Sequence, residues 1–472
     1  MASTVREAGR SMGERLSHDD LLDGPDVPVT QAPPWRAGRS EDHQLPSVRG
    51  LVSADFTVVG AGLAGLSTAY HLLRYAPGAD VAVVDAGHPA AGASGHGTGL
   101  LGPRAGPPVD RAIRRHGPDA ARRMHRASED AVTGVLELCR TLDVPVRTGE
   151  QLVVARSPQG LARLSGQAAA YRALGLDVPP LSAAGVRERI DVPCQAGLLH
   201  RHAATLDPAL LTAALARACA AGGARLYGRS PVVGRDVTGT GGTRLLFPRG
   251  ELRTGAGVFA VNGAAGALGL PVGTVAPLEV HAIATEPLKP AAREVLGEVS
   301  GAALVDAARL APYFRLTPDG RLVLGGGRAS LPGPPGTDGA RRDDRARLST
   351  WRWLAERMRA LHPLLADTAV THRWTGRIGV TLDDLPVVGP LAGTPGMWFI
   401  GGCGGHGLAL SVAHGAHVAR QLVGGGTGDG VGGEQTLPWH RSAAPRLPLG
   451  GAGRVMLRHI LDRLDRGVRG AA

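Results

Sequence analysis

Early in the chain, the hydrophobic positions change from irregular to regularly patterned. Residues 1–50 are polar, rich in proline and poorly periodic, so we expect an irregular N-terminal arm. The β-branched run at 56–59 predicts a buried strand, and apolar residues at helical spacing in 63–73 predict a helix that Pro77-Gly78 ends. A second apolar run at 81–84 completes a βαβ unit with a right-handed crossover.

Beyond this unit, helical and strand patterns alternate along the chain. Helices are expected within residues 110–143, 160–175, 206–221, 341–360 and 407–424. Strands are expected at 149–157, in short pieces across 224–264, and at 278–288, 313–327 and 397–404. Pro318-Asp319-Gly320 predicts the turn of a hairpin. Asp207 is the expected N-cap of the helix at 206–221.

The composition is that of a globular protein with more than one core. A chain of 472 residues, 43% of them hydrophobic, is long enough for two domains. The net charge of +11 comes almost entirely from arginine, and no compact arginine stripe with interleaved aromatics indicates nucleic-acid binding. Four widely spaced cysteines predict neither a metal site nor disulfides. No signal peptide or membrane-spanning run is evident, so the cytoplasm is the expected location.

The segment 60–65, which reads GAGLAG, lies between the first strand and the first helix, where a Rossmann phosphate loop belongs. Gly60 permits a tight turn, Gly62 lets the backbone approach a pyrophosphate, and Gly65 allows close helix–sheet packing. The first amides of the helix then meet the phosphates. Asp85 ends the second strand, 20 residues after Gly65, and is expected to bind the adenosine ribose. A carboxylate at that position fits FAD and NAD better than NADP.

The segment after the second strand separates these cofactors. Residues 92–103 form a loop rich in glycine and serine rather than a third strand. Together with the block at 374–389 and the run GGCGGHGLALS at 401–411, this loop resembles the D-amino-acid-oxidase superfamily of flavoproteins, in particular its gamma-glutamylputrescine-oxidase-like branch. The resemblance covers most of residues 53–425.

The resemblance implies an α/β fold with two interleaved domains. One is a glutathione-reductase-like Rossmann FAD-binding domain, and the other is an α+β substrate domain built on a mostly antiparallel sheet. The expected division gives 53–148, 191–270 and 369–425 to the FAD-binding domain, 149–190 and 271–368 to the substrate domain, and 426–472 to a linker and a basic C-terminal helix.

The resemblance also implies which residues bind FAD. In the superfamily the loop matching 92–99 wraps the pyrophosphate and the flavin, and the last glycine run lies under the flavin at a helix N-terminus. The full expected set is Gly60, Gly62, Leu63, Ala64, Gly65, Asp85, Ala86, Ala93, Ser94, Gly95, His96, Gly99, Val233, Asn262, Gly376, Asp383, Gly402, Gly404, Gly405, His406, Gly407 and Leu408.

The substrate side is less fully specified. Amino-acid oxidases of the superfamily hold the substrate carboxylate with an arginine, in a block that here reads GRIG at 376–379. Ile378 occupies the arginine position, and Arg377, one residue away, belongs to the opposite face of a strand. An amine without that carboxylate is therefore favoured over an α-amino acid. Tyr313 and Arg315 share one face of the predicted hairpin and are alternative anchors, unless that face is solvated.

Three histidines are candidates for roles at the flavin. His96 aligns with the position at which dimethylglycine and sarcosine dehydrogenases carry FAD covalently, and a non-covalent contact or a solvated side chain is the alternative. His406 is expected either to face the substrate or to be a packed hydrogen-bonding residue, and His281 is expected to face the flavin cavity. The superfamily oxidises the neutral amine by hydride transfer, so no strong base is required.

These expectations describe an FAD-dependent amine oxidoreductase that produces an imine, with O2 as the favoured electron acceptor and H2O2 as the product. The alternatives are an amino-acid dehydrogenase or oxidase, an NAD-dependent dehydrogenase and a non-catalytic flavin-binding protein. Residues 453–470 predict a basic amphipathic helix, which either docks on the body of the protein or lies on a membrane surface.

Overall fold

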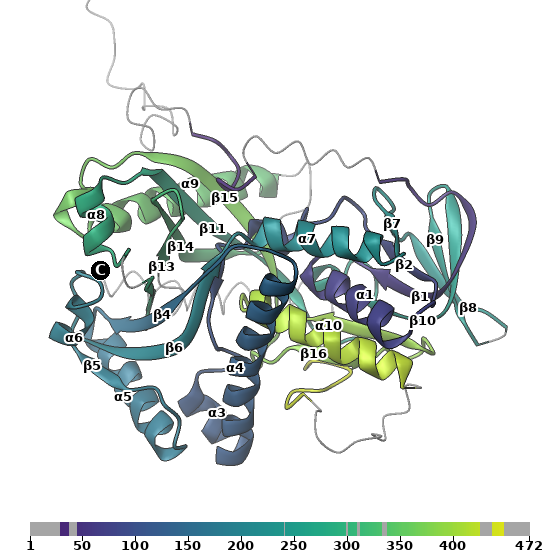
Figure 1. Ribbon diagram of the computed structural model, residues 1–472, viewed down its shortest axis with the longest axis horizontal. Coiled ribbons are helices and arrows are strands. Elements are labelled where there is room, and N and C mark those ends of the chain that lie inside the picture. The colour runs from purple at the N-terminus through teal and green to yellow at the C-terminus, as the bar shows by residue number, and fades with distance from the viewer. Residues whose placement is uncertain are drawn as a thin grey trace, which may run out of the picture.

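The computed structural model describes most of the chain as two sheets with helices packed against them (Figure 1). The described residues are 29–36, 45–239, 241–298, 301–308, 312–332, 338–424 and 437–447. Of the segment 426–472, predicted to hold a linker and a basic helix, the structure describes only 437–447, and the predicted helix at 453–470 lies outside the described residues. Among the described residues, no helix is both long enough and apolar enough to cross a membrane.

The first sheet, here the Rossmann sheet, is built on parallel strands. Its order is β16 (Val387–Pro390), β17 (Met397–Gly401), β10 (Gly250–Phe259), β1 (Gly50–Val59), β2 (Val81–Val84) and β7 (Arg225–Tyr227), with β8 (Gly234–Val237) and β9 (Thr243–Phe247) pairing beside β10. The strands from β17 to β7 run parallel, whereas β16 is antiparallel to β17. The carboxyl ends of β1, β10 and β17 therefore lie next to one another at one edge, where open α/β sheets bind ligands.

Helices cover the Rossmann sheet through apolar faces at helical spacing. α1 (Leu63–Tyr75) buries Leu63, Leu66, Ala69 and Leu72, as its sequence pattern predicts. It packs beside α10 (Gly407–Val423) and α7 (Pro208–Ala221), and all three share one hydrophobic core with α4 (Pro118–Thr141) (Figure 1). The predicted cap is confirmed, because the Asp207 carboxylate accepts hydrogen bonds from the first amides of α7.

The second sheet, here the antiparallel sheet, has nine strands. Its order is β15 (Val370–Val380), β11 (Ala276–Pro287), β14 (Arg321–Ser330), β13 (Tyr313–Leu316), β12 (Ala303–Asp306), β4 (Val146–Ala155), β6 (Ala196–Leu206) and β3 (Leu100–Leu101), with β5 (Pro180–Ser182) beside β6. All its pairs are antiparallel except that of β4 with β12. The predicted hairpin is confirmed as β13 and β14.

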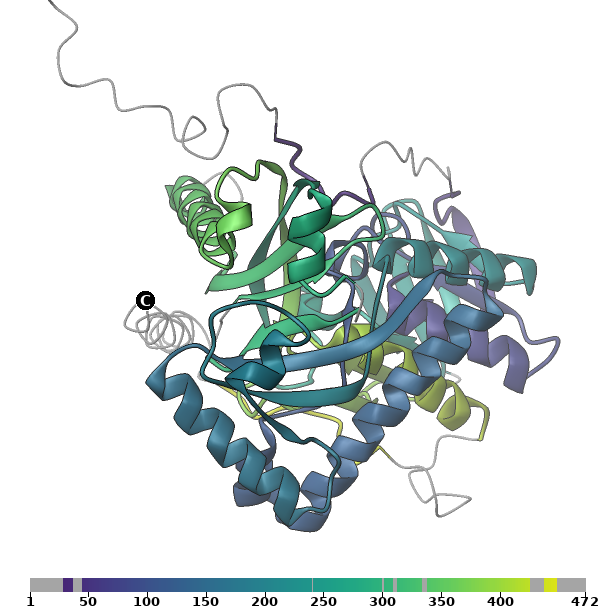
Figure 2. The same cartoon turned by 60° about the vertical axis from the view of Figure 1, so that its left-hand side comes forward.

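Helix α9 (Asp338–Arg359) covers one face of the antiparallel sheet over β11 and β14 and buries a second core with it (Figure 2). The remaining helices are α2 (Ala93–His96), α3 (Val109–His116), α5 (Pro158–Ala173), α6 (Ala183–Arg187) and α8 (Pro290–Val295). The opposite face of the sheet, with Ala282, Val323 and Trp374, meets α7 and the segment around Ala90 of the Rossmann domain.

The sheets divide the chain differently from the predicted segments. β6 falls in the segment 191–270, and β15 in the segment 369–425, both expected in the FAD-binding domain. Both strands pair within the antiparallel sheet instead. The chain therefore crosses to the Rossmann sheet only after residue 206, and after residue 380 at its later return.

Candidate functional site

At its three glycines, the phosphate loop (residues 60–65) has no room for a side chain. A Cβ at Gly60 would lie 2.6 Å from the Ala260 carbonyl oxygen, and Gly60 has φ +109°, which glycine alone adopts readily. A Cβ at Gly65 would collide with the Gly60 carbonyl oxygen. Gly62 is the N-cap of α1, and a Cβ at this position would lie 2.9 Å from Ser94 Oγ. The loop thus forms a cradle of bare backbone at the positive end of a helix, which suits a pyrophosphate.

Residues 88–99, here the serine loop, lie against this cradle. Leu63 N donates a hydrogen bond to Ser94 Oγ over 2.9 Å. The Asp85 carboxylate accepts hydrogen bonds from the amides of Ala61 and Gly87, each over 2.7 Å, so it ties the phosphate loop to the start of the serine loop. A carboxylate has about four lone-pair sites. Those that remain on Asp85 can accept ribose hydroxyls.

The glycine run 401–405 comes to the same edge of the Rossmann sheet. Gly402 N donates to Asn262 Oδ1 over 2.9 Å, and Gly404 N donates to the Gly379 carbonyl over 3.0 Å. Asn262 follows β10, and the run follows β17, so both leave the sheet beside the phosphate loop that follows β1. The three glycine-rich stretches therefore converge on one region.

Strand β15 presents alternate residues to this region. Trp374 donates its indole N–H to the His96 carbonyl over 2.9 Å, and a Cβ at Gly376 would lie 3.5 Å from His96 Cβ. Ile378 Cδ1 is 3.7 Å from the Cβ position of Gly405. Arg377, in contrast, lies on the α9 side, where it forms an ion pair with Glu279 at 3.3 Å. The strand alternation predicted for Arg377 and Ile378 thus matches the structure.

His281 does not face the flavin cavity, and this prediction is corrected. On β11 it lies on the same face as Glu279, where its ring packs edge-on against Trp351 of α9 with centroids 5.8 Å apart. Its Nδ1 is 2.9 Å from Thr375 Oγ1. Burial lowers the pKa of His281 to about 4, with a smaller contribution from Arg347.

Tyr313 and Arg315 lie on the inward face of the sheet, so the solvated alternative is excluded. Arg315 is 2% exposed and donates hydrogen bonds to the backbone carbonyls of Thr98 and Leu206. Burial lowers its pKa to about 10. Its donors are used by the protein, so Arg315 is corrected from substrate anchor to structural clamp. Burial raises the pKa of Tyr313, partly offset by a hydrogen bond with Thr98.

His406 lies at the N-cap of α10, with its Nδ1 3.1 Å from the Gly404 carbonyl. Burial lowers the pKa of His406 to about 3, and the charge of Arg104 adds to this effect. The imidazole is therefore neutral at pH 7 and is a weak base. The structure brings it to the glycine run, whose amides together with the α10 dipole make this end of the site electropositive.

Two expected cofactor residues have structural partners of their own. Val233 is 65% exposed, and its amide donates to the Leu246 carbonyl in the β8–β9 pair. Asp383 forms an ion pair with Arg441 at 2.5 Å, which binds the segment 437–447 to the body. Burial alone would raise the pKa of Asp383, but Arg441 outweighs it and the pKa is lowered. Because these contacts use the Val233 amide and the Asp383 carboxylate, we expect neither group to be available to FAD, and their contact with FAD stays an untested prediction.

Three residues near the site were missed by sequence reasoning. Trp35 belongs to the N-terminal arm and donates its indole N–H to the Gly95 carbonyl over 3.1 Å. Trp374 was noted as part of a motif without a role. Arg104 is exposed on the segment between β3 and α3, and its charge acts on His406. Arg104 follows the serine loop by five residues, beyond β3, and no motif or periodicity in the sequence marked it.

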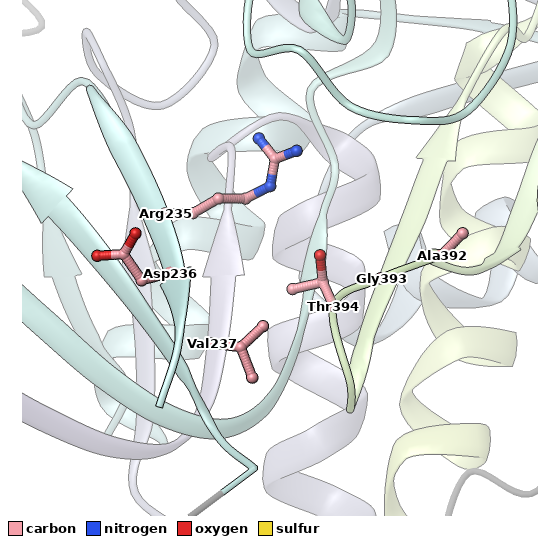
Figure 3. A pocket seen from close by; sticks show the side chains of 6 residues that line it. All are labelled: Arg235, Asp236, Val237, Ala392, Gly393 and Thr394. Carbon is pink, nitrogen blue, oxygen red and sulfur yellow. The ribbon is translucent and has the colours of Figure 1, made fainter. Parts of the chain in front are cut away.

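A separate pocket lies at the opposite edge of the Rossmann sheet (Figure 3). It is lined by Arg235, Asp236, Val237, Ala392, Gly393 and Thr394. The last three residues precede the amino end of β17, whereas the glycine run follows its carboxyl end. This pocket is therefore not part of the region where the three stretches converge.

The fold and this region define a class of protein: a two-domain flavoprotein oxidoreductase in which an antiparallel sheet faces the ligand edge of a Rossmann sheet. A profile of the DAO family, described as FAD dependent oxidoreductase, matches residues 55–421, and the chain belongs to this family. Its cofactor is accordingly FAD, and the glycine cradle, Asp85 and the run 401–405 fit that cofactor.

Relatives and solved structures agree with this family. The chain is 28% identical over 411 residues to the probable oxidoreductase OrdL of Rhizobium meliloti, covering 85% of this chain and 90% of that protein. It is 27% identical over 387 residues to the gamma-glutamylputrescine oxidoreductase of Escherichia coli, covering 79% and 84%. The crystal structure of glycine oxidase from Geobacillus kaustophilus matches with a TM-score of 0.63 at 21% identity, covering 79% of this chain and 95% of that one.

Proposed function

We propose that this enzyme oxidises the C–N bond of an amine to an imine, which water then hydrolyses, and that O2 accepts the electrons to give H2O2. The observation that carries the proposal is the register of β15. It places Ile378 beside Gly405 and turns Arg377 away to Glu279, so this strand offers no cation to a substrate carboxylate. The relative named gamma-glutamylputrescine oxidoreductase supports an amine substrate.

We propose that FAD is held by the residues that follow, and the hydrogen bonds of Asp85, Ser94 and Asn262 with the phosphate loop and the glycine run support this. These residues are Gly60, Gly62, Leu63, Ala64, Gly65, Asp85, Ala86, Ala93, Ser94, Gly95, His96, Gly99, Asn262, Gly376, Gly402, Gly404, Gly405, His406, Gly407 and Leu408. Bound FAD supplies the two-electron oxidant for the carbon next to the amine nitrogen. Whether His96 forms a covalent bond to FAD is decided by acid precipitation, because covalent flavin stays with the precipitated protein.

The protein's own groups are arranged to bind an uncharged amine. His406 is neutral at pH 7, and burial raises the pKa of Tyr313, so neither side chain carries charge there. Neither His406 nor Tyr313 is a strong base at pH 7, so we expect the substrate to lose its ammonium proton before or during binding. The rate of substrate oxidation at low substrate concentration is therefore expected to rise with pH as the amine deprotonates.

A carboxylate-bearing amine or amino acid is the second candidate, and Arg104 favours it. Arg104 is exposed and close enough for its charge to lower the pKa of His406. An anionic group of a substrate that extends from the glycine run toward Arg104 would be stabilised by that charge. In this case the amine is still the reacting group.

The test compares matched substrates under anaerobic conditions. The purified enzyme is mixed with 1,4-diaminobutane, with its N-acetyl derivative and with ornithine, which is 1,4-diaminobutane with an added α-carboxylate, and bleaching of the flavin absorbance is followed. Faster bleaching by the first two compounds supports an amine without a carboxylate as the substrate, and bleaching by ornithine alone refutes that preference in favour of the second candidate. Admitting O2 and measuring H2O2 then tests the acceptor. Failure of every substrate to bleach flavin that dithionite does bleach would favour a non-catalytic protein.

A further inference from the structure

The described part of the N-terminal arm, residues 29–36, crosses from the antiparallel sheet to the serine loop. Thr30 extends the edge of β15: its amide donates to the Thr371 carbonyl over 2.9 Å, and Arg373 N donates to the Thr30 carbonyl over 3.0 Å. Five residues later the chain buries Trp35, which is 8% exposed. The irregular segment 29–36 therefore places the buried indole of Trp35 between the two domains.

Residues 35 and 36 both bind backbone carbonyls of the serine loop. Trp35 donates its indole N–H to the Gly95 carbonyl over 3.1 Å, and Arg36 donates to the Ala90 carbonyl over 3.2 Å. These carbonyls lie on either side of Ser94, whose hydroxyl accepts the Leu63 amide of the phosphate loop. The serine loop is thus held on one side by the N-terminal arm and on the other by the start of α1.

Two residues of the antiparallel sheet complete the arrangement. Trp374 packs edge-on against Trp35, with centroids 5.5 Å apart and an interplanar angle of 80°, and donates to the His96 carbonyl over 2.9 Å. The two indoles therefore hold consecutive carbonyls. Arg315 lies over the Trp35 ring at 5.3 Å and donates to the Thr98 carbonyl.

The serine loop needs such external partners because its internal structure is small. Its helix α2 has four residues, and a single helical turn is not stable by itself. Its position is consequently set by the groups that bind its carbonyls from outside. Ser94 and His96, which face the proposed cofactor site, move with it.

We propose that Trp35 is a positioning residue for the flavin site: with Trp374, it fixes the serine loop against the phosphate loop. The N-terminal arm then acts as a strap that joins the antiparallel sheet to the FAD-binding domain. This role requires only that the enzyme binds FAD, and it is independent of the substrate.

The test uses Trp35→Phe in the full-length, FAD-loaded enzyme, which keeps an aromatic ring and removes the N–H donor. The matched control is Trp439→Phe, because Trp439 is also buried and donates its N–H over 2.9 Å to His414 of α10, not to the serine loop. Hydrogen–deuterium exchange is followed in peptides covering residues 88–99. Visible circular dichroism reports the surroundings of the bound flavin.

We expect Trp35→Phe to raise exchange in residues 88–99 about five-fold relative to the parent, as expected for the loss of one neutral hydrogen bond. The exchange is read at the amides of Gly95 and Gly97, which donate hydrogen bonds to the carbonyls of Gly92 and Ala93. The flavin dichroism is expected to change in this variant and not in Trp439→Phe. Arg36→Gln, which removes the anchor at Ala90 and keeps the Trp35 indole, is expected to show a smaller change in the same direction.

Unchanged exchange in residues 88–99 would overturn the proposal. So would an equal increase throughout the protein, since this would indicate general destabilisation. An unchanged flavin dichroism with faster exchange would show that the loop does not position the flavin. All three outcomes are measured without any amine, so they are distinct from failure of the proposed reaction.

Discussion

Replacing Gly62 separates the stability of the fold from the binding of FAD. Its backbone angles, φ −84° and ψ −177°, are accessible to alanine without strain. A Cβ there would lie 2.9 Å from Ser94 Oγ but 3.9 Å from Ser94 Cβ. Gly62→Ala is therefore expected to displace the hydroxyl and break its bond with Leu63 N, which costs about 1 kcal/mol of unfolding free energy in the apoprotein.

The Ser94→Ala background removes the colliding atom and leaves an ordinary contact of 3.9 Å. In this background Gly62→Ala is expected to change the unfolding free energy of the apoprotein by less than about 0.5 kcal/mol. The added methyl group still occupies the space by which the backbone approaches a pyrophosphate. The affinity for FAD is therefore expected to fall at least about ten-fold in both backgrounds, equivalent to about 1.4 kcal/mol.

Urea unfolding of the apoprotein, followed by circular dichroism, measures the first quantity, and titration with FAD, followed by flavin fluorescence, measures the second. Gly166→Ala is the control, because Gly166 is an exposed position of α5 where a Cβ meets nothing within 4 Å. It is expected to leave FAD affinity unchanged. If Gly62→Ala in the Ser94→Ala background binds FAD as tightly as Ser94→Ala alone, Gly62 does not border the pyrophosphate, and the cradle is assigned wrongly.

Three further predictions address other parts of the structure. Burial lowers the pKa of His200 to about 3, so the folded state keeps it neutral while the unfolded chain is protonated below pH 6.5. Stability is lost as the pH falls from 6.5 toward 3, and His200→Phe is expected to reduce this loss by about 1 kcal/mol per pH unit, measured by unfolding between pH 7 and 4.5. Arg377→Gln is expected to leave the amine KM within about two-fold, because Arg377 faces α9; a ten-fold rise would contradict the assignment of strand faces. Asp383→Asn is expected to lower the unfolding free energy by about 1–2 kcal/mol through loss of the Arg441 pair, with FAD affinity unchanged; a loss of FAD affinity alone would support the predicted cofactor role.

Elements with local signals were predictable from the sequence. The cap at Asp207 and the hairpin at 318–320 each rest on residues within a few positions of one another, and the βαβ unit rests on consecutive patterns within residues 56–84. β6 has no such signal: a polar stretch, His200-Arg201-His202, interrupts its apolar run, and its partner β4 lies about 50 residues earlier. Long-range pairing decided its place, and the predicted domain boundary at 191 was wrong for that reason.

The candidate site shows the same limit. Strand alternation correctly grouped Tyr313 with Arg315 and separated Arg377 from Ile378. It could not tell which face α9 covers, and so His281 was placed on the wrong side of the sheet. Trp35, which donates to the Gly95 carbonyl of the serine loop, lies in a proline-rich arm without periodicity. No sequence pattern therefore marked it.

The register of β15 links the cofactor side of the site to the substrate side. Its inward residues meet two of the glycine-rich stretches: Trp374 binds the His96 carbonyl of the serine loop, Gly376 leaves space beside that histidine, and Ile378 contacts Gly405 of the glycine run. A shift by one residue toward the start of the strand would replace all three with Arg373, Thr375 and Arg377, and would put two arginine charges inside the site. The bond that positions the serine loop and the apolar residue that disfavours a substrate carboxylate therefore depend on one register. Selection for flavin binding is expected to restrain the substrate side of this strand as well.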